Sequence, residues 1–287
     1  WVSADRDDGY NWVGGPDLRI ELSPTLSWTT QYLYTQDKHT DVVVDEEGEE
    51  DEVIVREAGH AFQSALEGGK TPFFWELGVL DISENFDPDL GFIPRKNIVG
   101  PYIEANFSKE IADGPVRQVE AGVFATYFQN HEGDVVLRDF YGEAGVELAN
   151  KFDFEISRGE FFRRPFDNRS TRVRVEYNRQ DRLNSVSLTY DWGIFQDVPY
   201  NAIEFEKPFG IGDRFTGSVD ADYRIEQRPT GDEDVWLFRI ESEYTWAWDG
   251  RIKLTLEESS EDRYNHTLLF AYEDVKYWDF YFVLNDA

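Results

Sequence analysis

Paired carboxylates are the first residues in this sequence whose types and spacing could do chemistry. Glu241 and Glu243 stand two residues apart, and two neighbouring carboxyl groups can serve as acid and base in glycoside hydrolysis. Acidic residues number 58 among 287, however, so pairs of this kind arise by chance. The sequence has no Gly-x-Ser-x-Gly motif, no glycine-rich phosphate loop followed by Lys-Ser or Lys-Thr, and no cysteine. We therefore expect that the protein is not an enzyme. We interpret the two glutamates as part of a row of charged side chains in contact with water.

Histidines and acidic runs are the remaining candidates for chemistry, and both concern metal ions. The four histidines, His39, His60, His131 and His266, are scattered without metal-site spacing, so no ligand role is expected for them. An acidic run offers the several oxygen ligands that Ca²⁺ needs, although this one lacks the EF-hand spacing. We expect a solvated loop that holds Ca²⁺ loosely at most, and no other cofactor. Its candidate ligands are Asp45, Glu46, Glu47, Glu49, Glu50 and Asp51.

The charge of the chain narrows the classes of partner. The formal net charge is -30, with Lys+Arg 28 against Asp+Glu 58. Phosphate backbones are bound by clustered lysines and arginines, so no nucleic-acid partner is expected. The chain also has no methionine and begins at Trp1, so we expect it to be the C-terminal part of a longer protein.

Strands must position these side chains, because a period of two dominates the sequence. Between Val235 and Asp249 the even positions are mostly apolar, and the odd positions carry most of the charge. The same alternation returns in residues 18–23, 152–157, 172–177, 185–192, 214–226 and 251–257. Tight turns such as Ser23-Pro24-Thr25 alternate with long acidic connections, and helical patterns are almost absent. We expect an all-β chain of about fourteen or more antiparallel strands in up-and-down order.

Two kinds of all-β protein fit this alternation, because the apolar face of each strand can meet either a core or lipid. Many of the strands are long, aromatic residues gather near strand ends, and the polar face carries opposite charges along single strands. These features favour a transmembrane β-barrel that forms a single domain over residues 1–287, and a water-soluble β domain is the alternative. In a barrel we expect the lumen to be lined by Arg172, Arg174, Arg214, Asp220, Asp222, Arg239, Glu241 and Glu243.

The stretch from Glu84 to Asn97 departs from the alternation, since apolar residues are threaded through a turn sequence, Asp87-Pro88-Asp89-Leu90-Gly91. Its apolar side chains must be buried locally, so we expect a folded loop that packs against the barrel wall or mouth. The packing residues are Phe86, Pro88, Leu90, Phe92 and Arg95. A loop that only fixes strand register and a loop that acts as a gate or docking surface are both open.

Three stretches of the sequence carry a resemblance to a known family. The segment 85–95, reading NFDPDLGFIPR, resembles the most recognisable stretch of an uncharacterised outer-membrane β-barrel family of Gram-negative bacteria, the domain of unknown function 5916. The segment 9–18 and the ending, 268–272 with 281–285, are similar to a hairpin region and to the closing strands of that family. Full-length members carry a carbohydrate-binding family-nine-like module ahead of the barrel, so the resemblance implies that the first strands and this module lie upstream of Trp1.

The resemblance implies a cellular location and a candidate class of ligand. It places the chain in the outer membrane of a Gram-negative bacterium, with outer-membrane lipid as a partner and a glycan as a candidate ligand. The first expectation is a barrel that binds glycan or another solute and passes it across the outer membrane. The alternative is a structural barrel subunit of a cell-surface assembly, whose acidic loops bind protein partners.

Overall fold

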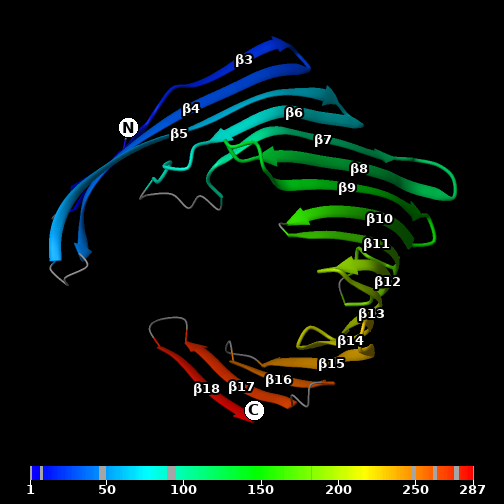
Figure 1. Cartoon of the computed structure of the whole chain (residues 1–287). Coiled ribbons are helices and arrows are strands. Elements are labelled where there is room, and N and C mark those ends of the chain that lie inside the picture. Colours follow the sequence, from blue (N-terminus) through cyan, green and yellow to red (C-terminus); the bar gives the residue numbers. More distant parts are fainter. Residues whose placement is uncertain are drawn as a thin grey trace. The chain divides into compact units, whose positions relative to one another are not determined.

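The computed structural model of the chain describes residues 2–6, 9–44, 50–88, 95–163, 165–181, 183–246, 250–260, 264–274 and 278–286. These residues form eighteen β-strands and no helix (Figure 1). The strands are β1 (Val2–Arg6), β2 (Gly9–Gly14), β3 (Asp17–Ser23), β4 (Leu26–Val44), β5 (Glu50–Lys70), β6 (Phe73–Ile82), β7 (Ile98–Glu110), β8 (Val116–Gln129), β9 (Val135–Leu148), β10 (Phe152–Arg163), β11 (Phe166–Tyr177), β12 (Val186–Phe195), β13 (Val198–Ile211), β14 (Phe215–Arg228), β15 (Gly231–Trp246), β16 (Gly250–Ser259), β17 (Tyr264–Asp274) and β18 (Trp278–Asp286).

Pairing between the strands is antiparallel and mostly follows chain order. Strands β3 to β7 pair each with the next, as do strands β11 to β18, and β2 pairs with β1 and with β4. The segments that alternate in the sequence lie in β3, β10, β11, β12, β14, β15 and β16. The prediction of an all-β, antiparallel, up-and-down fold with fourteen or more strands is confirmed.

Residue contacts divide the chain into two compact units. The first unit comprises Trp1–Phe107, Gly122–Tyr141 and Phe161–Pro165, and the second comprises Ser108–Ala121, Gly142–Glu160 and Phe166–Ala287. The single domain expected over residues 1–287 stays a prediction. Among the described residues no helix has the length and apolar character needed to cross a bilayer.

A small apolar core lies in the first unit, beside the irregular stretch after β6. Phe86 has 1% of its surface exposed and packs with Ile82, Ile98 and Phe128, which come from β6, β7 and β8. Gly59 of β5 permits this packing, because a Cβ at that position would lie 2.3 Å from the backbone nitrogen of Phe86. The chain after β6 therefore lies directly against the backbone of β5.

Polar contacts fasten both ends of the same stretch. The side-chain amide of Asn11 donates to the carbonyl of Asp87 at 2.7 Å, and the ammonium of Lys96 lies 2.7 Å from the Asp87 carboxylate. Arg95 donates to the carbonyl of Val136 at 3.2 Å. Pro88 is buried as well, whereas Leu90 and Phe92 lie outside the described residues. The gating and register-fixing roles that the sequence left open stay predictions.

Candidate functional site

The registers of β11 to β16 sort their side chains into two neighbouring rows on opposite faces. In one row the aligned residues are Glu176, Ser187, Glu206, Asp220, Arg239 and Glu257. One position along, the aligned residues of β11 to β15 are Val175, Leu188, Phe205, Ala221 and Phe238. Successive side chains of a strand point to opposite faces, so the second unit has a polar face and an apolar face. The polar face carries the first row, and the apolar face carries the second.

Arg172 anchors one cluster of the polar face. Its guanidinium lies 3.2 Å from the carboxylate of Asp191 on β12 and 3.7 Å from that of Glu204 on β13. The other oxygen of Asp191 accepts a hydrogen bond from the Tyr200 hydroxyl at 3.1 Å. The guanidinium carbon of Arg224 lies 4.2 Å from the centre of the Tyr200 ring, a cation–π distance. Asp191, with 7% of its surface exposed, therefore connects two strands.

Arg239 and Lys253 continue the charged contacts toward β16. Arg239 donates to Glu257 at 2.7 Å, and Lys253 lies 2.9 Å from Glu241. The Glu241 carboxylate therefore has an ammonium partner, whereas a glycosidase uses two carboxyl groups about 5 to 10 Å apart on either side of a sugar. This pairing suits a row of charges, and the expectation that the chain is not an enzyme stays a prediction.

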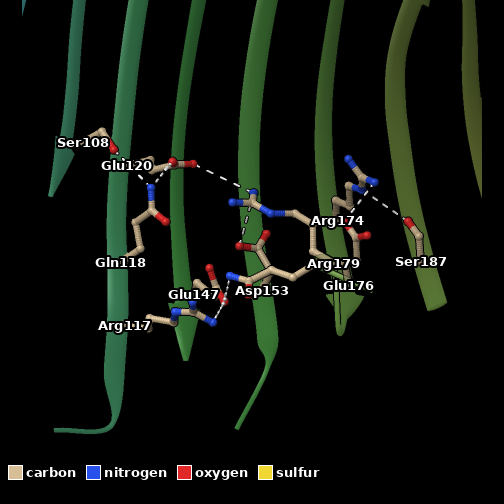
Figure 2. A network of polar contacts seen from close by, with 11 residues as sticks. Ser108, Arg117, Gln118, Glu120, Glu147, Asp153, Arg174, Glu176, Arg179 and Ser187 are labelled. Carbon is tan, nitrogen blue, oxygen red and sulfur yellow. Dashed lines mark hydrogen bonds and ion pairs between the residues drawn. The ribbon is translucent and has the colours of Figure 1, made fainter. Parts of the chain in front are cut away.

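A second network joins β8 to β12 through Arg179, which lies in the connection after β11. Figure 2 shows its side chains on the same side of neighbouring strands. The guanidinium of Arg179 lies 3.5 Å from Asp153 on β10 and 3.9 Å from Glu120 on β8. Glu147 on β9 accepts from Arg117 at 3.1 Å, and Arg174 pairs with Glu176 at 3.0 Å (Figure 2).

Buried acids make this network unusual. Glu147 and Asp153 are each 5% exposed, and Glu176 is 6% exposed. Charge is costly to remove from water unless partners replace the lost hydration, and the arginines supply that replacement. Oε2 of Glu147 is buried and has no hydrogen-bond partner among the described residues. The network is therefore polar, crowded and incompletely satisfied by protein groups.

The connection between β11 and β12 places Arg179 through its own hydrogen bonds. The backbone nitrogen of Asp181 donates to the carbonyl of Asn178, and that of Asn184 donates to the carbonyl of Asp181, both at 2.9 Å. The carboxylate of Asp181 accepts from the Asn184 side chain at 2.9 Å and from the backbone nitrogen of Leu183 at 3.2 Å. These bonds favour the charged form, so they hold the pKa of Asp181 below its usual value. A turn that is stapled in this way presents Arg179 and Gln180 to the acids of β9 and β10.

An open cavity of about 450 Å³ lies on the polar face beside this turn. Its lining includes Arg174, Glu176, Arg179, Ser185, Glu206 and Ser218. Guanidinium groups, carboxylates and hydroxyls together offer hydrogen-bond donors and acceptors of both charge signs. Such a lining can hold water and small polar or charged solutes.

The residues expected to line a lumen take different places. Arg172, Arg174, Arg239 and Glu241 make the ion pairs described above. Asp220 accepts from the Ser218 hydroxyl at 3.1 Å, Asp222 lies opposite Glu204, and Glu243 lies opposite Lys253 in register. Arg214 is an exposed residue of the turn before β14, outside the strands. The lumen-lining role stays a prediction for all eight.

The calcium candidates fall where the structure says nothing of side chains. Asp45, Glu46, Glu47 and Glu49 lie outside the described residues, and only the backbone of Glu50 and Asp51, in β5, is described. Loose binding of Ca²⁺ stays a prediction.

Several residues of the site were not expected from the sequence. Asp153 and Asp191 lie inside segments whose alternation was recognised. The sequence therefore predicted the strand face on which each side chain lies, but not its partners. No such signal marked Arg179, Gln180 or Glu147. Arg179 and Gln180 lie in a turn, and the acids that they contact, Asp153 and Glu147, are about 30 residues away in the sequence. Contacts of this kind depend on which strands pair and in what register.

Replacing Asp191 tests whether the Arg172 cluster stabilises the second unit. We expect Asp191→Ala to lower the free energy of unfolding by about 1–2 kcal/mol, because it removes the partner of both Arg172 and Tyr200, and Arg172 is too exposed for a larger loss. Urea unfolding followed by tryptophan fluorescence measures this. Asp197→Asn, in the exposed turn after β12, is the control. Equal stability of the two variants would contradict a structural role for Asp191.

Comparison with known proteins gives no family. No family model matches the chain, and no curated protein matches it. Among solved structures it is similar to OccK9 (OpdG) of Pseudomonas aeruginosa, with TM-score 0.44 and 10% identity over 96% of this chain and 92% of that chain. It is also similar to OpdK of the same organism, solved with vanillate, with TM-score 0.43 and 10% identity over 99% of this chain and 95% of that chain. Likenesses this distant assign neither a family nor a solute.

Proposed function

We propose that the chain is part of a β-barrel in the outer membrane of a Gram-negative bacterium, and that its polar face borders a hydrated path for polar solutes. One observation carries this proposal: polar and charged residues are buried more often than hydrophobic ones. Among the described residues, fourteen polar or charged residues are buried against five hydrophobic ones. A water-soluble protein buries chiefly apolar side chains.

The apolar face supports the membrane part of the proposal. Leu188 is 49% exposed, Ile203 is 47% exposed, and many other large hydrophobic side chains of β12 to β16 are similarly uncovered. A continuous apolar surface of this kind favours aggregation in water, but it matches the acyl chains of a bilayer. Antiparallel strands that pair in sequence satisfy each other's backbone groups, which a membrane requires. Strands of 10 to 16 residues, as in β12 to β16, are long enough to cross.

The polar face supports the solute part. Its charges are paired yet partly open, because the side chain of Glu204 is 42% exposed and that of Arg172 is 45% exposed. Together with the cavity of about 450 Å³, this arrangement suits water and small charged solutes. Acidic groups outnumber basic groups in the chain, so we propose a preference for cations. Passage of a glycan rests on the resemblance alone and belongs to this proposal as a finer hypothesis.

Ion selectivity in planar bilayers tests the proposed path. We expect the protein to conduct with a preference for cations, and Glu206→Gln to lower the ratio of cation to anion permeability. A unit charge about 10 Å from a passing ion is worth about 0.4 kcal/mol in water, which corresponds to roughly a twofold change before salt screening. Reversal potentials in a KCl gradient measure the ratio.

The matched control is Asp197→Asn, which removes one negative charge in a turn, away from the polar face, at a positive φ that asparagine tolerates. If both variants change the ratio equally, the polar face is not the path.

Liposome swelling with neutral oligosaccharides tests the glycan hypothesis separately. Absence of any conductance, together with a stoichiometric protein partner, would favour the structural subunit.

A further inference from the structure

Three side chains with metal-binding atoms gather in the first unit. His60 lies on β5, Asp81 lies on β6, and His131 lies in the turn that connects β8 to β9. One ligand atom from each lies within 4.8 Å of the others. None of the three takes part in the polar face, and the sequence spacing gave no reason to connect them.

Asp81 lies between the two imidazoles. Its Oδ1 lies 2.9 Å from Nε2 of His131, and its Oδ2 lies 3.5 Å from Nε2 of His60. Around a tetrahedral ion with bonds of about 2.0 Å, neighbouring ligand atoms are about 3.3 Å apart. The two distances fall on either side of this value, so each imidazole nitrogen lies within about 0.4 Å of the spacing from Asp81 that such an ion requires.

Asn97 sets the tautomer of His131. The backbone nitrogen of His131, which can only donate, lies 3.0 Å from the side-chain atom Oδ1 of Asn97, so this atom is the amide oxygen. The same oxygen lies 2.8 Å from Nδ1 of His131, which must therefore carry a hydrogen. In a neutral imidazole this leaves the lone pair of Nε2 aimed at Asp81. Two electron-rich atoms at 2.9 Å repel each other unless a cation lies between them, either a proton or a metal ion.

Both histidines are held by their surroundings. The backbone nitrogen of His60 donates to the Ser83 hydroxyl at 2.7 Å, and the His60 ring stacks on Tyr32 with ring centres 6.1 Å apart. His131 lies in a turn closed by Asn130, whose side chain accepts from the backbone nitrogen of Asp134 at 2.7 Å. An arrangement fixed before the ion arrives loses little entropy on binding.

We propose that Nε2 of His60, Nε2 of His131 and the carboxylate of Asp81 bind a divalent transition-metal ion such as Zn²⁺. Two imidazoles and one carboxylate suit zinc and its neighbours better than Ca²⁺ or Mg²⁺, which prefer oxygen ligands alone. The Nδ1–H bond to Asn97 is the outer contact that ligating histidines commonly make. The exposed fractions of the side chains, 36% for His60, 30% for Asp81 and 40% for His131, leave the site open to the ion and to water as the remaining ligand.

Titration with ZnCl₂ tests the site, using the whole chain folded in detergent and stripped with a chelator. Isothermal calorimetry should show one saturable site, and His131→Gln or His60→Gln should weaken it at least tenfold. Asn97→Gly should weaken it about 10- to 100-fold, because the outer contact is lost while every ligand remains, and glycine tolerates the positive φ of residue 97. Co²⁺ in place of Zn²⁺ should give a visible absorption band that the His131→Gln variant lacks.

His39→Gln is the matched control, because His39 also lies beside a carboxylate, with Nδ1 2.5 Å from Asp37, but within the described part of the chain it belongs to no group of three possible metal ligands. This variant should bind Zn²⁺ like the parent. Circular dichroism of each variant separates loss of the site from loss of the fold. If the parent has no saturable site, or if His131→Gln binds as tightly as the parent, the cation between His131 and Asp81 is a proton and the proposal is wrong.

Discussion

Ile203→Arg is expected to destabilise the folded chain by about 2–4 kcal/mol, the cost of an arginine near the middle of a lipid-facing strand. Ile203 lies well inside β13 and is already 47% exposed, so the new side chain meets no steric obstacle. In water an exposed arginine at this position would cost within about 0.5 kcal/mol. The size of the loss therefore reports which solvent the apolar face meets. Urea unfolding of the protein folded into phospholipid vesicles measures it.

Glu206→Arg is the control for this experiment, because it places the same side chain on the opposite face of the same strand. Glu206 is exposed and lies opposite Asp220, so an arginine there finds an acidic neighbour. We expect this variant to stay within about 1 kcal/mol of the parent. Equal and small losses for both variants would place water on both faces, and the proposed membrane location would be abandoned for a soluble β protein.

Phe86→Ala is expected to lower the free energy of unfolding by about 3–5 kcal/mol, because it empties the most deeply buried large side chain of the described residues. The ring packs on Ile82, Ile98 and Phe128, and the surrounding strands are too constrained by their ladders to close the gap. Phe86→Leu should restore most of the loss, since it refills much of the volume. Chemical unfolding followed by tryptophan fluorescence measures both variants.

Gly59→Ala offers an independent check from the other side of this contact. A methyl group at residue 59 would lie about as close to the backbone of Asn85 as to that of Phe86, at 2.4 Å and 2.3 Å. Neither backbone can yield without moving the chain after β6.

A Phe86→Ala variant as stable as the parent would show that the loop is fastened by its polar contacts, through Asn11, Arg95 and Lys96, and not by the buried ring.

The strands were predictable because their signal is local. Alternation in residues 214–226 and 251–257 needs no knowledge of the rest of the chain, and these segments became β14 and β16. The turn at Ser23-Pro24-Thr25 was readable for the same reason, since proline and small polar residues favour turns by themselves. The burial of Phe86 was also expected, because an aromatic side chain in a loop must find cover nearby.

Partnerships between strands were not predictable, because they depend on register. His60 and Asp81 meet only because β5 pairs with β6 in one of several alignments, and His131 reaches them only through the turn that follows β8. A shift of one residue in this register would turn His60 to the other face of the sheet. Scattered histidines therefore gave no metal signal in the sequence, although the folded chain brings two of them to one carboxylate.

The hairpin of β4 and β5 is longer than a membrane crossing requires. The 19 residues of β4 extend about 60 Å at roughly 3.3 Å per residue, whereas the apolar band of an outer-membrane barrel is about 25 Å tall (Figure 1). Every residue of β4 has an aligned partner in β5, from Leu26 with Gly68 to Val44 with Glu50, so the two strands stay paired along the whole length of β4. If the chain spans the outer membrane as proposed, part of this ribbon projects into the aqueous phase beyond the lipid headgroups.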